Sequence, residues 1–280
     1  MTVEASTGTM PGPPAWRVVR RHARLYLAIA RYCLARDLEY RASLAFNLLR
    51  ESLYALLQVA FVDIVFLNVD AVGDWTADRM LVLMGTYTLV SNLTYALFWE
   101  TMTRLSSVVN SGELDLVLTK PVSAQFYVSV RRIAFMNFAP AAFGAGIAAW
   151  GMARLGVNPS PGDLAAYAIL CVSAVVTCYA LWFMSVLGVF WTGRLQNAGA
   201  MFEPVVSLAR VPSDTLRGPL RVVLTFVLPL AFVGTVPAQA ILGIAEAWHV
   251  PYAIGTAVVA VFASNRLWRR ALRSYSSASS

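Results

Sequence analysis

Charged residues are scarce in this sequence. Only 13% of the 280 residues are Asp, Glu, Lys or Arg, whereas 58% are hydrophobic. A soluble globular domain has about a quarter charged residues, so the apolar excess here is more than one soluble core would bury. Several apolar runs approach the roughly 20 residues that a helix needs to cross a bilayer, and the mean hydropathy is +0.62. We therefore expect an all-α polytopic membrane protein.

Cysteine, histidine and lysine are also rare, at three, two and one residues. The three cysteines do not suggest a disulfide framework, and the cysteines and histidines lack the spacing of metal ligands. Lys120 is not preceded by the glycine of a phosphate-binding loop, and neither G-x-S-x-G nor H-E-x-x-H is present. We therefore expect a chain that is not an enzyme and holds no metal and no cofactor of its own.

A hydrophobic signal segment is missing from residues 1–15, which are expected to form a disordered N-terminal tail. In residues 16–42, apolar side chains recur at helical spacing on one side and arginines occupy the other. We expect this segment to be an amphipathic helix on the cytoplasmic surface of the membrane; a soluble helix that packs on a partner is the alternative. The arginines of its polar side are Arg17, Arg20, Arg21, Arg24 and Arg31.

Six apolar runs in residues 43–265 predict a transmembrane domain of six helices. Cationic residues gather in the N-terminal segment, in the loop after the second run, in the stretch 192–221 and in the basic tail 266–280. These groups share one side of the membrane if both termini are cytoplasmic. The net charge of +7 then reflects topology and contact with anionic membrane lipids rather than nucleic-acid binding. The expected spans are 44–67, 80–102, 133–150, 164–191, 222–242 and 250–264.

Few ionisable residues fall inside these spans, and none lies plainly at a helix centre. Glu100 precedes Arg104 by four residues, which predicts an ion pair on one helix. Pro229 and Pro237 lie in the fifth span, where each removes a helix hydrogen bond; we expect either a broken helix that bends during gating or a static kink. An ion- or proton-coupled transporter that acts without an ATPase is the alternative function, and it usually needs ionisable groups or broken helices at the midplane.

A polar segment at about 104–122 separates the second and third spans and is expected to contain a short cytoplasmic coupling helix. Asn110 is placed to cap this helix, with Glu113 three residues later. Leu114 and Leu118 are expected to share its apolar face, and a proline ends it. The residues expected to contact a soluble partner are Glu113, Leu114, Asp115, Leu118, Lys120 and Pro121.

The same segment carries a family resemblance. Its G-x-L-D-x-x-L-x-K-P-V pattern resembles the G-x-L-D-x-x-L-x-(R/K)-P-V segment of type-2 ATP-binding-cassette (ABC) exporter permeases, in the branch of small six-helix permeases. Residues 224–243, with their two prolines, resemble the fifth helix of that family, and the resemblance extends from about Ser43 to the C-terminus. Lys120 stands where members more often have arginine, so the charge is kept but bidentate pairing is lost. The residues that carry the pattern are Gly112, Leu114, Asp115, Leu118, Lys120, Pro121 and Val122.

The resemblance implies a permease subunit that exports a lipophilic, drug-like, peptide or lipid substrate across a bacterial plasma membrane. It implies a second permease, identical or different, and a cytoplasmic ABC ATPase subunit that binds ATP and Mg²⁺. The segment 112–121 would be the coupling helix, and the N-terminal amphipathic helix would connect the bundle to the membrane surface. A membrane-embedded enzyme that acts on lipids and a membrane anchor without transport are the other classes considered.

Overall fold

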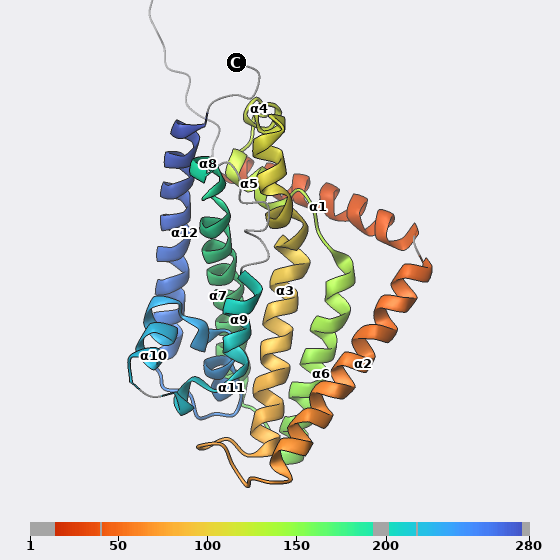
Figure 1. Cartoon of the computed structure of the whole chain (residues 1–280), viewed down its shortest axis with the longest axis vertical. Helices are drawn as coiled ribbons and strands as arrows, with labels where there is room; N and C mark the ends of the chain where they lie inside the picture. The colour runs from red at the N-terminus through yellow and green to blue at the C-terminus, as the bar shows by residue number, and fades with distance from the viewer. Residues whose placement is uncertain (1–14, 40, 193–201, 217, 276–280) are drawn as a thin grey trace, which may run out of the picture.

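The computed structural model describes residues 15–39, 41–192, 202–216 and 218–275. Within these ranges every regular element is a helix, apart from one isolated bridge between Val72 and Trp75. The all-α prediction is therefore confirmed for the described part of the chain (Figure 1). The long helices are α1 (Ala15–Glu39), α2 (Arg41–Phe66), α3 (Ala77–Asn110), α6 (Phe138–Leu155), α7 (Pro161–Val186) and α12 (His249–Ser274). The short ones are α4 (Glu113–Leu118), α5 (Ala124–Val130), α8 (Val189–Thr192), α9 (Phe202–Ser207), α10 (Pro219–Val222) and α11 (Thr235–Ile241).

The bundle has two ends, which we name after the short helices found there. At the α4 end, Leu114 of α4 belongs to the same hydrophobic cluster as Val128 of α5 and Trp268 of α12. At the α11 end, Ile241 of α11 packs in a second cluster with Trp75, which precedes α3. Helix α1 and the last turn of α12 both lie at the α4 end (Figure 1). The two ends of the described chain therefore lie on the same side of the bundle.

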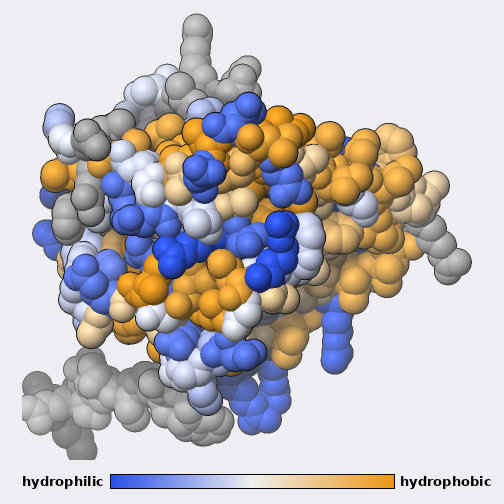
Figure 2. Space-filling view, turned by 90° about the horizontal axis from the view of Figure 1, so that it is seen from below, coloured by the Kyte–Doolittle hydropathy of each residue, from blue (hydrophilic) through white to orange (hydrophobic). Residues whose placement is uncertain are grey.

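Three helical segments are long and apolar enough to cross a membrane: α3, α12 and the continuous stretch 161–192 of α7 and α8. A fourth crossing results if α5 and the helix over 135–155, which meet at an angle of 63°, form one bent span. Helix α2 is not among these segments and carries Arg50, Glu51 and Asp63, yet it exposes large apolar side chains along most of its length. Figure 2, seen from the α11 end, shows hydrophobic residues over the side toward which α2 leans. These features identify a multi-pass membrane protein.

The predicted fifth span, 222–242, is not one helix. It consists of the end of α10, a π-helical turn, a 3-10 turn and α11. Pro229 separates the two turns because it lacks the N–H that would continue a helix. Gly234 precedes α11, and a Cβ at this position would lie 2.7 Å from the carbonyl oxygen of Ala209. All these pieces lie in the half of the bundle nearer the α11 end (Figure 1).

The chain crosses the bundle earlier than the sequence predicted. Helix α8 ends at the α4 end, whereas Thr215 lies beside Gly73 in the α2–α3 loop at the α11 end. The neighbouring Asp214 accepts a 2.7 Å hydrogen bond from Gln239 of α11. The prediction that the whole stretch 192–221 shares the side of the coupling helix is therefore wrong.

Helices α3 and α6 pack backbone to backbone at glycines. A Cβ at Gly144 of α6 would lie 2.6 Å from the backbone nitrogen of Leu89 and 2.7 Å from the carbonyl oxygen of Gly85. A Cβ at Gly85 would lie 2.4 Å from the backbone nitrogen of Ala148. Only glycine fits at such a distance. Small residues at helix contacts are typical of packing inside membranes, so α3 and α6 form the closest pair of long helices here.

Candidate functional site

A short helix, α4, is present where the coupling helix was predicted, but its start differs from the prediction. Helix α3 continues to Asn110, and α4 begins at Glu113 after a two-residue turn. Gly112 is the residue before α4 and has a φ of 75°, a left-handed conformation that favours glycine. The prediction that Asn110 caps this helix is wrong, because Asn110 is the last residue of α3 and no side chain caps α4.

The leucines of α4 divide between the core and the surface. Leu114 and Val117 are fully buried in the cluster at the α4 end. Leu116 and Leu118 remain exposed by 68% and 41%. The prediction that Leu118 shares a face with Leu114 is therefore wrong. This six-residue helix therefore packs two side chains in the bundle and leaves two other apolar side chains exposed.

The charged residues Glu113, Asp115 and Lys120 each lie close to a residue of another element. Glu113 accepts a 2.6 Å hydrogen bond from Arg131, the residue that follows α5. The ammonium group of Lys120 lies 4.9 Å from the centre of the Tyr127 ring, a cation–π contact. At the other side, burial and the Asp115 carboxylate raise the pKa of Tyr275, the residue after α12. Helix α4 is thus bonded to the residue that follows α5, and Tyr275 lies near it at the end of α12. Pro121 lies in the turn that connects α4 to α5.

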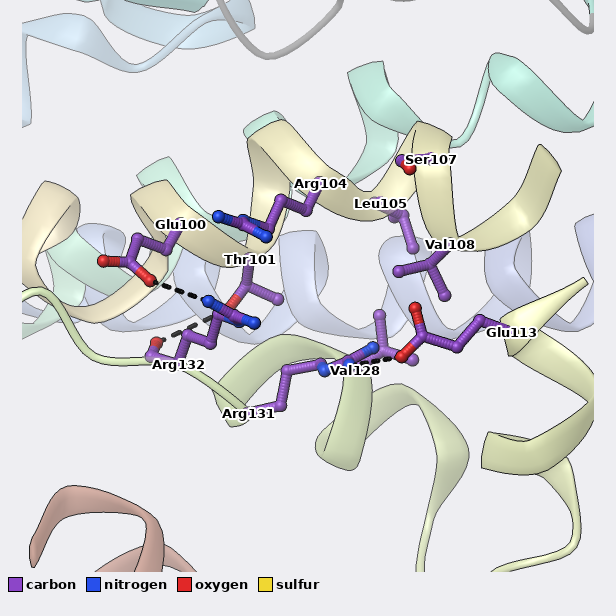
Figure 3. A pocket seen from close by; sticks show the side chains of 10 residues that line it. All are labelled: Glu100, Thr101, Arg104, Leu105, Ser107, Val108, Glu113, Val128, Arg131 and Arg132. Carbon is purple, nitrogen blue, oxygen red and sulfur yellow. Dashed lines mark hydrogen bonds and ion pairs between the residues drawn. The ribbon is translucent and has the colours of Figure 1, made fainter. Parts of the chain in front are cut away.

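A cavity of about 110 Å³ lies between α3, α4 and α5 (Figure 3). Figure 3 shows Arg131 reaching Glu113 and Arg132 reaching Glu100 across its floor. One nitrogen of Arg131, Nη1, is buried without a hydrogen-bond partner. Arg104 also lines the cavity and has no carboxylate within 4 Å among the described residues. The predicted ion pair between Glu100 and Arg104 is therefore absent.

Glu100 instead connects α3 to the N-terminal helix. Its carboxylate accepts hydrogen bonds from Arg36 at 3.0 and 3.2 Å and lies 3.6 Å from Arg132. The hydrogen bond to Glu100 raises the pKa of Arg36 above its ordinary value. The neighbouring Asp37 is buried and accepts a 3.1 Å hydrogen bond from the backbone N–H of Phe135. The end of α1 is therefore fixed against both α3 and the start of the segment that contains α6.

Helix α1 covers most of the predicted surface helix. Its predicted arginine face is exposed at all four positions where side chains are described, while Cys33 and Asp37 point into the protein. The fifth arginine, Arg17, lies within α1, but its side chain is outside the described part of the structure. The exposed arginines are Arg20, Arg21, Arg24 and Arg31. Contact with a membrane surface stays a prediction.

The two prolines of the predicted gating helix occupy different positions. Pro229 lies between the π-helical turn and the 3-10 turn. Pro237 is the third residue of α11, where a backbone N–H has no partner within the helix. Pro237 therefore removes no hydrogen bond from α11, and only Pro229 lies at an interruption.

Sequence reasoning missed Arg36, Asp37, Arg131 and Tyr275 as residues of this site. The Glu113–Arg131 and Arg36–Glu100 contacts join residues 18 and 64 positions apart, so no helical spacing reveals them. A weak signal existed in Asp37, which is an acidic residue beside an arginine in a helix that is mostly basic. No group of three or more His, Cys, Asp and Glu side chains in the described ranges could hold a metal ion.

Comparison with known families adds an independent observation. The family model described as "ABC-2 family transporter protein" matches residues 53–279. The matched region begins within α2 and includes α4, the cavity beneath it and both prolines. No curated protein and no solved structure matches the chain.

Proposed function

Because the chain belongs to the ABC-2 transporter family, we propose that it is the permease subunit of an ATP-driven exporter. The observation that supports this role most directly is α4, a short helix at one end of the bundle whose Leu116 and Leu118 are exposed. Exposed apolar side chains on a short helix fit a groove in a partner protein. The proposed partner is a cytoplasmic ABC ATPase subunit, and ATP and Mg²⁺ bind to that subunit rather than to this chain. A second permease, identical or different, completes the transport path.

We propose that the α4 end is cytoplasmic and that the chain crosses a bacterial plasma membrane six times. Five of the crossings are α2, α3, the bent segment 124–155, the segment 161–192 and α12; the sixth follows because Thr192 lies at the α4 end and Thr215 at the α11 end. The arginines of α1, of the α4 cavity and of the last turns of α12 then lie inside, as the positive-inside rule requires. The segment 219–242 enters the bundle and leaves it at the outer surface.

The proposed mechanism transmits motion from the ATPase to the bundle. ATP binding closes the ATPase pair and displaces α4. Since Leu114 and Val117 are packed in the core, this displacement moves the buried cluster around them. The turn at Ser111 and Gly112 passes the motion directly to α3, and the glycine contact carries α6 along. The substrate is bound by apolar and aromatic side chains and released outside; it is lipophilic, drug-like, a peptide or a lipid.

Co-purification tests this proposal. The permease would be co-expressed with ABC ATPases of the same genome, beginning with those whose genes adjoin its own. The Leu118→Asp substitution is expected to abolish the complex and the substrate-stimulated hydrolysis of ATP, because it places a charge in an apolar contact. Leu67→Asp is the matched control, since Leu67 is also exposed but lies after α2 at the α11 end. Unchanged binding and hydrolysis with Leu118→Asp would contradict the role of α4. Transport by the permease alone in liposomes would favour an ion-coupled transporter.

A further inference from the structure

Two adjoining cavities lie between α2 and α3, and they differ in chemistry. The first is a groove of about 550 Å³ lined mainly by apolar side chains of α2 and the start of α3. The second is a pocket of about 330 Å³ lined mainly by polar and charged side chains. Tyr54, Gln58 and Arg210 line both cavities. The two therefore form one continuous site with an apolar half and a polar half.

The apolar half is shaped for a hydrocarbon chain. Leu57 and Phe61 of α2 lie on one side, and Met80 and Met84 of α3 lie on the other. Leu57 and Phe61 are also exposed at the surface of the bundle. The groove is thus open sideways, toward the lipid, as well as toward the polar pocket. Methionine side chains adapt to ligands of different shape.

Some groups of the polar half are already paired. Gln58 and Thr88 exchange hydrogen bonds of 2.9 and 3.2 Å. Arg50 is paired with the neighbouring Glu51. Glu203 also lines the pocket and is exposed. Ser91 and Asn92 donate hydrogen bonds to the backbone carbonyls of Tyr87 and Thr88.

Arg210 and Tyr95 carry the atoms without partners. The Arg210 guanidinium lies 5.1 Å from the centre of the Tyr87 ring, and no carboxylate is within 4 Å of it among the described residues. Its Nε atom is buried without a hydrogen-bond partner, and so is the hydroxyl of Tyr95. Burying a polar group without a partner is costly. A ligand that supplies acceptors for both groups would remove that cost.

We propose that this site binds an amphiphile with an acidic head group, a phosphate or a carboxylate. The head lies in the polar pocket, where it accepts hydrogen bonds from Arg210 and Tyr95. A guanidinium recognises such oxyanions through charge-assisted hydrogen bonds. The hydrocarbon chain occupies the groove between α2 and α3. That the bound amphiphile is the exported substrate rests on the function proposed above; its binding does not.

The depth of the two halves agrees with this orientation. Tyr95 lies nearer the α4 end of α3 than Met84 and Met80 do, so the polar pocket is nearer the α4 end than the apolar groove is. An amphiphile in this site therefore has its head toward the α4 end and its chain toward the α11 end, where Phe66 and Met80 line the groove. It enters sideways past α2, where Leu57 and Phe61 are exposed.

A binding experiment with the full-length chain tests the proposal. The protein would be placed in nanodiscs of phosphatidylcholine, and displacement of fluorescent dodecyl phosphate would be measured. Dodecyl phosphate and dodecanoate are expected to compete, whereas dodecyltrimethylammonium and inorganic phosphate alone are expected to be at least about tenfold weaker, since a charged hydrogen bond or a buried chain is missing. Competition by only one of the two acidic amphiphiles would show whether the head group bound at this site is a phosphate or a carboxylate. Equal or tighter binding of the cationic amphiphile would overturn the proposal.

Three variants show whether these residues form the site. Arg210→Gln is expected to weaken binding of dodecyl phosphate by about tenfold or more. Tyr95→Phe removes a hydroxyl that has no partner in the protein, so it is expected to fold normally and to weaken binding severalfold. Arg79→Gln is the control, because Arg79 lies outside both cavities and bonds only a loop carbonyl. Unchanged affinity in both site variants would overturn the proposal.

The other occupant of such a groove is a second copy of the chain. Leu57→Cys copies would be oxidised with and without dodecyl phosphate; a disulfide that forms equally fast in both cases would show that a second copy covers the groove and would overturn the proposal. Failure of the proposed function is distinguishable from failure of this site. If dodecyl phosphate binds through Arg210 but neither stimulates ATP hydrolysis nor is exported, the binding site stands and the transport role does not.

Discussion

Arg131 Nη2 donates a 2.6 Å hydrogen bond to Glu113 Oε1, so the first residue of α4 is tied to the residue that follows α5. This contact joins the two ends of the segment 113–131, which contains α4 and α5. Arg131 approaches from below α4, at the cavity shown in Figure 3. A force applied to the exposed leucines of α4 therefore acts on α5 as well as on α3.

The Glu113–Arg131 pair is expected to matter for coupling more than for folding. A partly exposed ion pair contributes about 0.2–1 kcal/mol to stability. Glu113→Arg is therefore expected to leave the thermal midpoint nearly unchanged and to lower substrate-stimulated ATP hydrolysis severalfold in the complex. Adding Arg131→Glu should restore part of that hydrolysis, because the pair is re-formed with reversed charges. A double variant no better than the worse single variant would show that the pair does not transmit motion.

Glu100 is expected to hold α1 on the bundle. Glu100→Gln leaves Arg36 and Arg132 without their shared carboxylate, so the end of α1 should detach more often. Trypsin should then cleave at the exposed arginines of α1 severalfold faster than in the wild type. Glu246→Gln at the α11 end serves as the control. Equal cleavage rates in the two variants would mean that α1 is held by other contacts.

The glycine contact between α3 and α6 offers a matched pair of substitutions. Gly144→Ala places a Cβ 2.6 Å from a backbone atom of α3, whereas a Cβ at Gly146 has nothing within 4 Å. Overpacking of this kind costs about 1–3 kcal/mol. Gly144→Ala is thus expected to lower the thermal midpoint measured in detergent, while Gly146→Ala leaves it unchanged or slightly raised. A lower thermal midpoint for Gly146→Ala than for Gly144→Ala would show that α6 does not contact α3 at Gly144.

Cysteine labelling tests which end of the bundle faces the cytoplasm. The three natural cysteines are buried, which keeps background labelling low. A membrane-impermeant maleimide added to whole cells is expected to label Thr215→Cys but not Leu118→Cys. After the cells are opened, both should react. Labelling of Leu118→Cys in intact cells would reverse the proposed orientation, and labelling of Thr215→Cys only in opened cells would place that residue inside.

The two prolines should behave differently when replaced. Pro237→Ala is expected to change transport and stability little, because the first turn of α11 needs no hydrogen bond from that position. Pro229→Ala restores an N–H at a real interruption between two turns, so it should alter transport rates severalfold if bending there accompanies gating. The transport rates of the Pro229→Ala and Pro237→Ala variants would be compared in vesicles that contain the complete transporter. A larger effect from Pro237→Ala would contradict this assignment.

Composition and pattern predicted the parts of the fold that depend on local sequence. The apolar runs at α3, α7 and α12 gave spans close to those in the structure, and Gly112 with its leucines located α4 within a few residues. Helix α12 continues to Ser274, however, so the predicted tail 266–280 begins as helix rather than as a separate segment.

The failures concern element ends, helix faces and contacts between distant residues. The crossing before Thr215 was missed because α9 and the 3-10 turn Leu208–Arg210 are short, so no apolar run of spanning length marks it. The segment 222–242 has that length, but its proline and glycine break it into pieces. Ion pairs were assigned by helical spacing, which led to Arg104 as the partner of Glu100 although Arg36 is 64 residues away. Hydropathy measures length and composition, and neither reports which helix lies beside which.

Helix α3 contains 34 residues, which corresponds to about 50 Å at the usual rise per residue. Its C-terminal end is joined to α4 by Ser111 and Gly112, and it packs against α6 at Gly85 and Gly144 with no side chain between the backbones. Because of this contact, α3 and α6 are expected to move together as one rigid unit. A tilt of about 5° applied at the α4 end moves the other end of α3 by about 4 Å over that length, at the end of the bundle where Gly73 and Thr215 lie side by side.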